Sequence, residues 1–175
     1  KFGASFKLNN NSLPLIIKGS EKLKPIKFLE NRGSAQCKSS VIFGGIKANG
    51  KTKIKAKKSR NHTELLFKYL KLPIKIKKNK NFDLIEVCKA SDIKPLNYNI
   101  PSDISSSAFF IILTALSKNS KINIKNVNIN PTRTGILKIL KLMGIKIKTY
   151  NPRIYKGEKI ADLHVESTKK FKSIN

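Results

Sequence analysis

The sequence has few acidic residues, few aromatic residues and no tryptophan. Only 10 of its 175 residues are Asp or Glu, against 37 Lys or Arg, which gives a formal net charge of +27 at pH 7. It also lacks a long hydrophobic run, because the longest apolar stretch, around residues 108–116, is too short to cross a bilayer. The lack of a long apolar run excludes a helical membrane protein. The hydrophobic content of 39% is typical of a folded soluble protein.

Cysteine is scarce as well. Cys37 and Cys88 lie far apart within apolar patterns, and the sequence has no Cys-x-x-Cys pair. Two such residues do not form a disulfide framework, so we predict buried thiols in a reducing cytosol and a cytoplasmic location. His62 and His164 are equally isolated and lack the spacing of metal ligands, so we predict no metal site.

The strong positive charge first suggests a nucleic-acid partner. However, only four of the basic residues are arginine, although nucleic-acid surfaces favour the arginine fork. No aromatic residues alternate with the basic runs, as stacking on bases would require. Lys, Ile and Asn share A/T-rich codons, so a biased genome explains the lysines more simply. We therefore interpret most lysines as solvated surface residues and retain a basic nucleic-acid-binding repeat protein as the alternative.

Several segments occur twice, at an offset of 70 residues. KPIKF at 24–28 returns as KPLNY at 94–98, and YLKLPIKIK at 69–77 returns as ILKLMGIKIK at 139–148 with one inserted residue. An offset that persists over this length is typical of a repeated supersecondary unit. The two copies differ where loops meet helices, and those positions are the candidates for function.

The first copy predicts a βαβαββ unit, because apolar residues alternate with lysine in the strands and share one face in the helices. Residues 1–23 are interpreted as the tail of an earlier unit, with two strands around an asparagine turn. Asn61 and Glu64 have the spacing of a capping box, and Leu65, Leu66, Tyr69 and Leu70 form the predicted apolar stripe of that helix. The predicted strands are 24–30, 51–57, 74–78 and 83–88, and the predicted helices are 34–47 and 61–70.

The second copy predicts the same order. Pro101-Ser102-Asp103 is a strong helix start, with Asp103 as the cap, and Arg133 lies just inside a later helix that Thr132 or Thr134 can cap. The first helix has a core-facing side formed by Ile104, Ala108, Ile111, Ile112, Ala115 and Leu116. The predicted strands are 95–100, 120–126, 145–150 and 161–167, and the second predicted helix is 132–143.

Two strand-to-helix loops of the first copy carry polar residues. Ser34-Ala35-Gln36 opens a helix, where backbone N–H groups and the helix dipole attract an anion. Arg60 opens the next helix and offers a rigid fork to phosphate. Taken alone, the first is better explained as a plain N-cap and the second as a surface ion pair. Both loops lie at the same end of the unit, so we expect Ser34, Gln36 and Arg60 to converge on an anion. No acid–base pair or phosphate-binding loop motif is visible.

Three segments carry a resemblance to a known family. They are SAQCKSSVIFGGIKANGKTKIKAKKSRNHTELL (34–66), IPSDISSSAFFI (100–111) and NVNINPTRTGILKILKLMGIKIK (126–148). In this order they resemble 5-enolpyruvylshikimate-3-phosphate synthase (EPSP synthase), in the bacterial branch with SAQ. The resemblance implies the enolpyruvyl transferase fold, an α/β (α+β) two-domain inverse α/β barrel of βαβαββ units. Residues 1–93 would then close the first globular domain, and 94–175 would open the second.

The resemblance also implies an activity and its binding residues. The family transfers the enolpyruvyl group of phosphoenolpyruvate to the 5-hydroxyl of shikimate 3-phosphate, in the pathway to aromatic amino acids, without metal or organic cofactor. Ser34, the backbone of Ala35, Gln36 and Arg60 match positions that bind shikimate 3-phosphate, and Gln36 also approaches phosphoenolpyruvate.

The family's catalytic residues fall outside this sequence. We therefore expect a fragment that is inactive alone, from an enzyme that is monomeric at full length. The sister transferase acting on UDP-N-acetylglucosamine is a second alternative, but its motifs are absent here.

Overall fold

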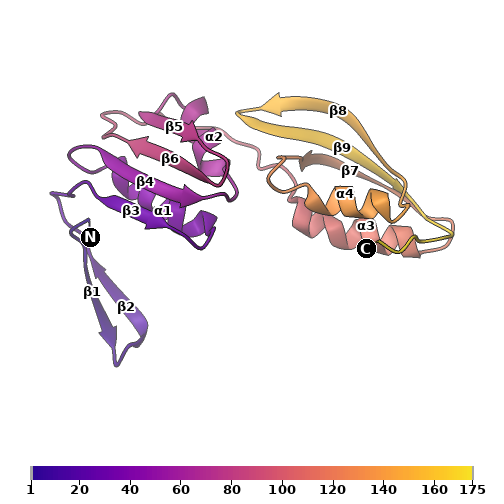
Figure 1. Cartoon of the computed structure of the whole chain (residues 1–175), viewed down its shortest axis with the longest axis horizontal. Helices are drawn as coiled ribbons and strands as arrows, with labels where there is room; N and C mark the ends of the chain where they lie inside the picture. The colour runs from indigo at the N-terminus through magenta and orange to yellow at the C-terminus, as the bar shows by residue number, and fades with distance from the viewer. Residues whose placement is uncertain (1, 175) are drawn as a thin grey trace. The chain divides into compact units, whose positions relative to one another are not determined.

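The computed structural model describes residues 2–174 and separates into two compact units, Lys1–Pro95 and Leu96–Asn175 (Figure 1). Each unit packs two helices against one face of a small sheet, which agrees with the predicted mixture of α and β structure. Within the described residues, no helix has the length and apolar character that crossing a membrane requires.

A separate hairpin precedes the first sheet. Its antiparallel strands are β1 (Ser5–Asn9) and β2 (Ser12–Lys18), which confirms the two strands predicted in this region. The turn residues Asn10 and Asn11 have positive φ angles of 45° and 58°, a conformation that asparagine adopts more readily than most residues. Every side chain of both strands is exposed, so the hairpin adds nothing to the core of the described residues.

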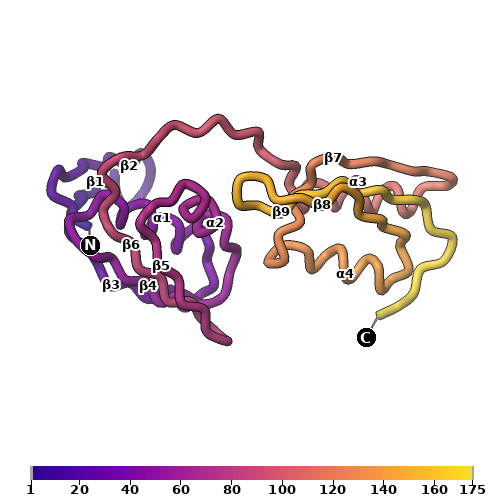
Figure 2. The backbone as a smooth tube through the Cα atoms, turned by 90° about the horizontal axis from the view of Figure 1, so that it is seen from above, coloured from indigo at the N-terminus to yellow at the C-terminus, as the bar shows by residue number. Residues whose placement is uncertain are grey.

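The first unit has the predicted βαβαββ order. Its sheet runs β3-β4-β6-β5, with β3 and β4 parallel and the other neighbours antiparallel. The helices lie together against this sheet (Figure 2). The elements are β3 (Lys27–Glu30), α1 (Ala35–Gly45), β4 (Thr52–Lys57), α2 (His62–Tyr69), β5 (Ile74–Lys78) and β6 (Phe82–Val87).

Alternation along β4 shows how this sequence forms a sheet with one buried face. Thr52, Ile54 and Ala56 are buried against the helices, while the lysines between them are exposed. Phe67 of α2 is 1% exposed and packs in the same cluster, in edge contact with Phe43 at 5.4 Å between ring centroids. The predicted stripe on this helix was wrong at Tyr69, which is exposed, and it missed Phe67, the buried aromatic. The three predicted leucines are partly buried.

The second unit has a sheet of order β7-β9-β8 with antiparallel neighbours. On α3, Ile104, Ile111 and Ala115 are buried as predicted, but Ile112 and Leu116 are 39% and 65% exposed. The predicted core-facing side is thus only partly buried within the described residues. The elements are α3 (Ile104–Leu116), β7 (Lys121–Asn128), α4 (Gly135–Leu142), β8 (Ile147–Tyr155) and β9 (Glu158–Glu166).

The strand predicted at 95–100 is absent, so the second unit lacks the opening strand of the βαβαββ order. Pro95 and Pro101 have no N–H to donate to a ladder, which disfavours pairing at both ends of the segment. Only Ser102 forms an isolated parallel bridge, to Val127. Within the segment, a side chain rather than a strand provides the acceptor: the Tyr155 hydroxyl accepts a hydrogen bond from the Asn99 N–H at 3.1 Å.

Candidate functional site

The loop before α1 is built around a buried carboxylate. Glu30 ends β3, is 4% exposed, and accepts hydrogen bonds from the N–H groups of Arg32 and Gly33, each at 2.9 Å. Burial opposes ionisation of this carboxyl, but the backbone donors of residues 32–34, with Lys38 nearby, outweigh it and lower its pKa. Gly33 has a φ of +77°, which favours glycine at this bend. The loop is therefore held in one conformation as it enters α1.

Ser34 and the two residues after it form the first turn of α1. The Ser34 hydroxyl accepts the Cys37 N–H at 3.2 Å, so the expected N-cap is confirmed. Ala35 is the first helical residue and is partly exposed, while Gln36 is exposed. Cys37 is also exposed and Cys88 partly so, which corrects the prediction of two buried thiols.

Arg60 lies in the loop before α2 and reaches the start of α1. Its Nη2 donates to Gln36 Oε1 at 3.4 Å, so the structure brings these two predicted residues together. Among residues 2–174 no ion pair joins Arg60 to a carboxylate. The predicted capping box of this helix was wrong, because Asn61 makes no side-chain cap and Glu64 has a different partner.

That partner is Lys38, which sequence reasoning missed. Lys38 is 1% exposed, its Nζ lies 2.6 Å from Glu64 Oε1, and it donates to the Arg60 carbonyl oxygen at 2.8 Å. Beside it, the hydroxyls of Ser39 and Thr63 lie 2.7 Å apart. These contacts tie the first turns of α1 and α2 together. A helical-face count could have found Lys38, since the residues three, four and seven positions on are Val41, Ile42 and Gly45, all buried.

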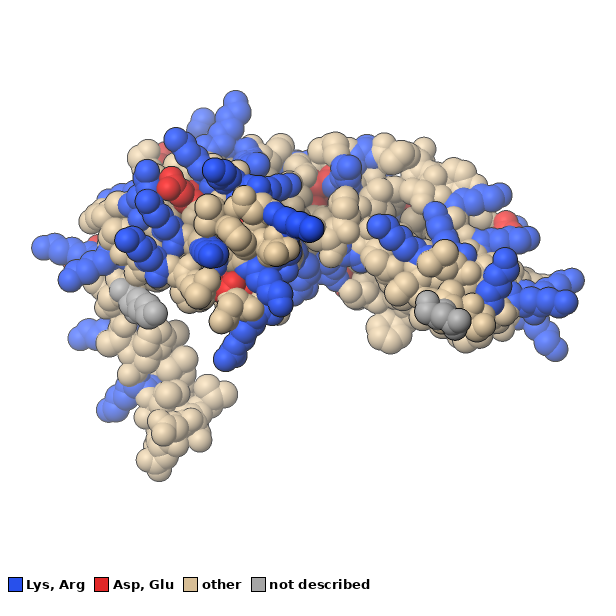
Figure 3. Space-filling model, viewed as in Figure 1, with Lys and Arg blue, Asp and Glu red and all other residues tan. Residues whose placement is uncertain are grey.

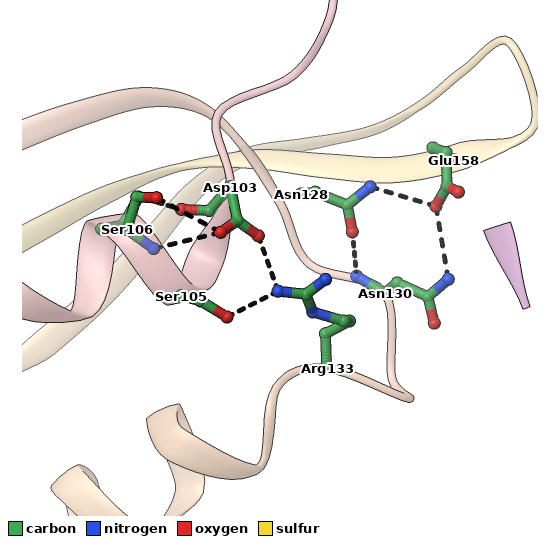
Figure 4. A network of polar contacts seen from close by, with 8 residues as sticks. Asp103, Ser105, Ser106, Asn128, Asn130, Arg133 and Glu158 are labelled. Atoms are coloured by element: carbon green, nitrogen blue, oxygen red, sulfur yellow. Dashed lines mark hydrogen bonds and ion pairs between the residues drawn. The ribbon is translucent and has the colours of Figure 1, made fainter. Parts of the chain in front are cut away.

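The second unit has a related polar cluster around its first helix (Figure 4). Asp103 caps α3 by accepting the Ser106 N–H at 3.1 Å, as predicted. Arg133 Nη2 lies 2.7 Å from Asp103 Oδ1 and 2.5 Å from the Ser105 hydroxyl. Burial raises the pKa of Asp103, but the Ser106 N–H and the Arg133 guanidinium outweigh this and lower it overall. Arg133, unlike Arg60, is thus paired with a carboxylate.

The helix after Arg133 begins later than predicted. α4 starts at Gly135 rather than 132, and Arg133 lies in the preceding turn. Thr134 occupies the N-cap position without a side-chain cap, so the predicted capping by threonine was wrong there. Instead the Asn130 side-chain oxygen accepts both the N–H and the hydroxyl of Thr132, at 2.9 and 2.8 Å. Asn130 also donates to the buried Glu158, as Figure 4 shows.

The chain resembles known proteins over nearly its whole length. Residues 1–175 match the family described as EPSP synthase (3-phosphoshikimate 1-carboxyvinyltransferase). The 3-phosphoshikimate 1-carboxyvinyltransferase of Legionella pneumophila (strain Corby) is 40% identical over 94% of this chain and 37% of its own length. That of Caldicellulosiruptor bescii is 41% identical over 96% of this chain and 39% of its own length. The chain therefore spans less than two-fifths of these curated relatives.

Solved structures of enolpyruvyl transferases are similar to this chain as well. An EPSP synthase from Acinetobacter baumannii is 33% identical and superimposes with a TM-score of 0.81 over 99% of this chain and 39% of its own. The enolpyruvyl transferase NikO from Streptomyces tendae, at 12% identity and a TM-score of 0.64, covers 97% of this chain and 40% of its own. At that identity it shows the fold alone.

Proposed function

Because this chain belongs to the EPSP synthase family, we propose that the protein containing it transfers the enolpyruvyl group of phosphoenolpyruvate to the 5-hydroxyl of shikimate 3-phosphate. The products are 5-enolpyruvylshikimate 3-phosphate and inorganic phosphate. The family match across residues 1–175 carries this proposal, and identities of about 40% to curated enzymes support it. We also propose that the full-length enzyme is a monomer and is located in the cytoplasm. The molar mass of the purified protein, measured by light scattering, tests whether it is a monomer.

We assign substrate binding to residues of the two strand-to-helix loops in the first unit. Arg60 pairs with the phosphate of shikimate 3-phosphate, and Ser34, the Ala35 backbone and Gln36 bind the same substrate. Gln36 also approaches phosphoenolpyruvate. The contact of Arg60 with Gln36 at 3.4 Å and the position of both at the positive end of α1 support this assignment. Two highly anionic substrates also suit the basic surface of the chain (Figure 3).

Calorimetric titration of shikimate 3-phosphate into the full-length protein tests the proposal. We expect Arg60→Ala to weaken binding by about 2 kcal/mol or more, the size of a lost charge-assisted pair. Lys68→Ala is the matched control, because it removes one positive charge from the last turn of α2, far along the helix from Arg60. Absence of binding by the wild-type protein at low salt, with phosphoenolpyruvate supplied, would contradict the function.

The chain by itself is expected to be inactive. It spans less than two-fifths of the length of its relatives. Turnover by the purified 175-residue chain would refute this part of the proposal.

A further inference from the structure

Among the lysines that the structure describes, Lys38 is the one that is fully enclosed. Figure 3 shows basic side chains projecting over both units, whereas Lys38, near the start of α1, is 1% exposed. Its ammonium group has two described partners, Glu64 Oε1 at 2.6 Å and the Arg60 carbonyl at 2.8 Å. The side chain of Glu64 is 5% exposed, so both charges are out of water.

A buried ion pair of this kind is a poor way to gain stability. Removing two charges from water opposes folding, and an apolar pair of similar volume is often as stable or more so. Glu64 Oε2 is also buried, with no hydrogen-bond partner among the described residues, so the pair is not even fully satisfied. What the lysine adds beyond a packed side chain is a directed bond to the backbone of Arg60.

We propose that Lys38 is a positioning residue for the anion site. Its Nζ–H bond to the Arg60 carbonyl fixes the loop before α2 against α1, so that the guanidinium stays beside Gln36 at 3.4 Å. Glu64 orients the ammonium for this bond, and the Ser39–Thr63 hydroxyl contact limits sliding between the helices. The inference rests on the proposed function, in which Arg60 meets the phosphate of shikimate 3-phosphate.

The position of this bond explains why it affects binding. It ends on the main chain of the arginine itself, so its loss moves the whole side chain rather than one rotamer. Misplacement of a binding group by about 1 Å can lower rates by about a hundredfold. The shikimate 3-phosphate interaction should therefore depend on Lys38 even though the ammonium does not touch the ligand.

Three variants of the full-length protein separate positioning from stability. Lys38→Met leaves Glu64 buried and unpaired, so it should lower both the free energy of unfolding and the affinity for shikimate 3-phosphate. Lys38→Met with Glu64→Leu replaces the pair by apolar groups and should recover most stability, but the Arg60 carbonyl still lacks its donor. Val87→Ala is the matched control, because it removes buried volume beside Gly45, at the other end of α1.

The measurements are urea stability, calorimetric affinity for shikimate 3-phosphate, and hydrogen exchange of the Leu65 amide. This N–H donates at 3.1 Å to the carbonyl oxygen of Asn61, the residue after Arg60. We expect the double variant to bind shikimate 3-phosphate about tenfold or more weakly than wild type, with faster exchange of the Leu65 amide. Val87→Ala should lose stability without that loss of affinity. A double variant that regains stability and binds like wild type overturns the proposal.

Hydrogen exchange distinguishes a loss of loop anchoring from a failure of the proposed function. If wild type does not bind shikimate 3-phosphate, the proposed function fails. Faster exchange confined to the Leu65 amide in the double variant would then still support Lys38 as the anchor of this loop. Unchanged exchange there would overturn the anchoring itself.

Discussion

Replacing Glu30 by glutamine should loosen the loop that leads into the candidate site. The carboxylate is 4% exposed and accepts the N–H groups of Arg32 and Gly33, one on each oxygen. Glutamine keeps one acceptor oxygen, but its NH₂ group faces the second donor. A hydrogen bond to a charged group contributes about 1.5–3 kcal/mol, so we expect Glu30→Gln to lower the free energy of unfolding by about 2–3 kcal/mol.

The pH dependence identifies the charge as the cause. The folded-state pKa of Glu30 is lowered from its ordinary value of 4.5. Its ionised form therefore stabilises the folded protein above pH 4.5, and this contribution is lost as pH falls through the folded-state pKa. The stability difference between wild type and Glu30→Gln should be constant near neutral pH and should narrow below pH 4.5.

Urea unfolding followed by circular dichroism, repeated at several pH values, measures this difference. Aspartate at position 30 is a useful companion, since it keeps the charge but is one methylene shorter. A difference of the same size at neutral and acidic pH would refute the reasoning, because the effect would then come from packing rather than from the carboxylate.

Two further predictions concern the core and the surface. Phe67→Ala should destabilise the protein by about 3–5 kcal/mol, whereas Tyr69→Ala on the exposed side of α2 should change the free energy of unfolding by about 1 kcal/mol or less in the same urea titrations. The lysine surface should bind single-stranded RNA only weakly, and raising salt from about 50 to 200 mM should abolish binding in a fluorescence titration. Tight, salt-resistant RNA binding would favour the nucleic-acid alternative.

The sequence predicted strands best where one face is buried. β4 alternates because one side contacts the helices and the other carries lysine, so period-two patterning was a sufficient guide there. The same patterning failed at 95–100, where apolar and polar residues also alternate. There the prolines remove ladder donors, and tertiary contacts from Tyr155 and Lys156 replace strand pairing.

The site was predicted only in part, because its strongest contacts join residues remote in sequence. Helix-start chemistry indicated Ser34, and the rarity of arginine indicated Arg60. The burial of Lys38 depends on Glu64, which lies on another helix, and composition had suggested that lysines are solvated. Glu30 gave no signal, because a carboxylate that binds three backbone donors appears only when the loop closes around it.

The two units differ in the residue that caps their first helix, and this difference yields a last prediction. Each unit directs an arginine from the loop before its second helix to the second residue of its first, Arg60 to Gln36 and Arg133 to Ser105. The cap is the neutral Ser34 in the first unit, but in the second it is Asp103, 2.7 Å from the arginine.

Ser34→Asp should therefore convert the first arrangement into the second. Asparagine and aspartate cap helices about equally well, so Ser34→Asp and Ser34→Asn should have similar stability. Both change a group that we propose binds shikimate 3-phosphate, but only aspartate can neutralise Arg60 and repel the phosphate. We expect the aspartate variant to bind at least about tenfold more weakly than the asparagine variant, as expected for a charge-assisted pair. Equal affinities of the two variants by calorimetry would show that the charge of the cap does not decide which unit binds the anion.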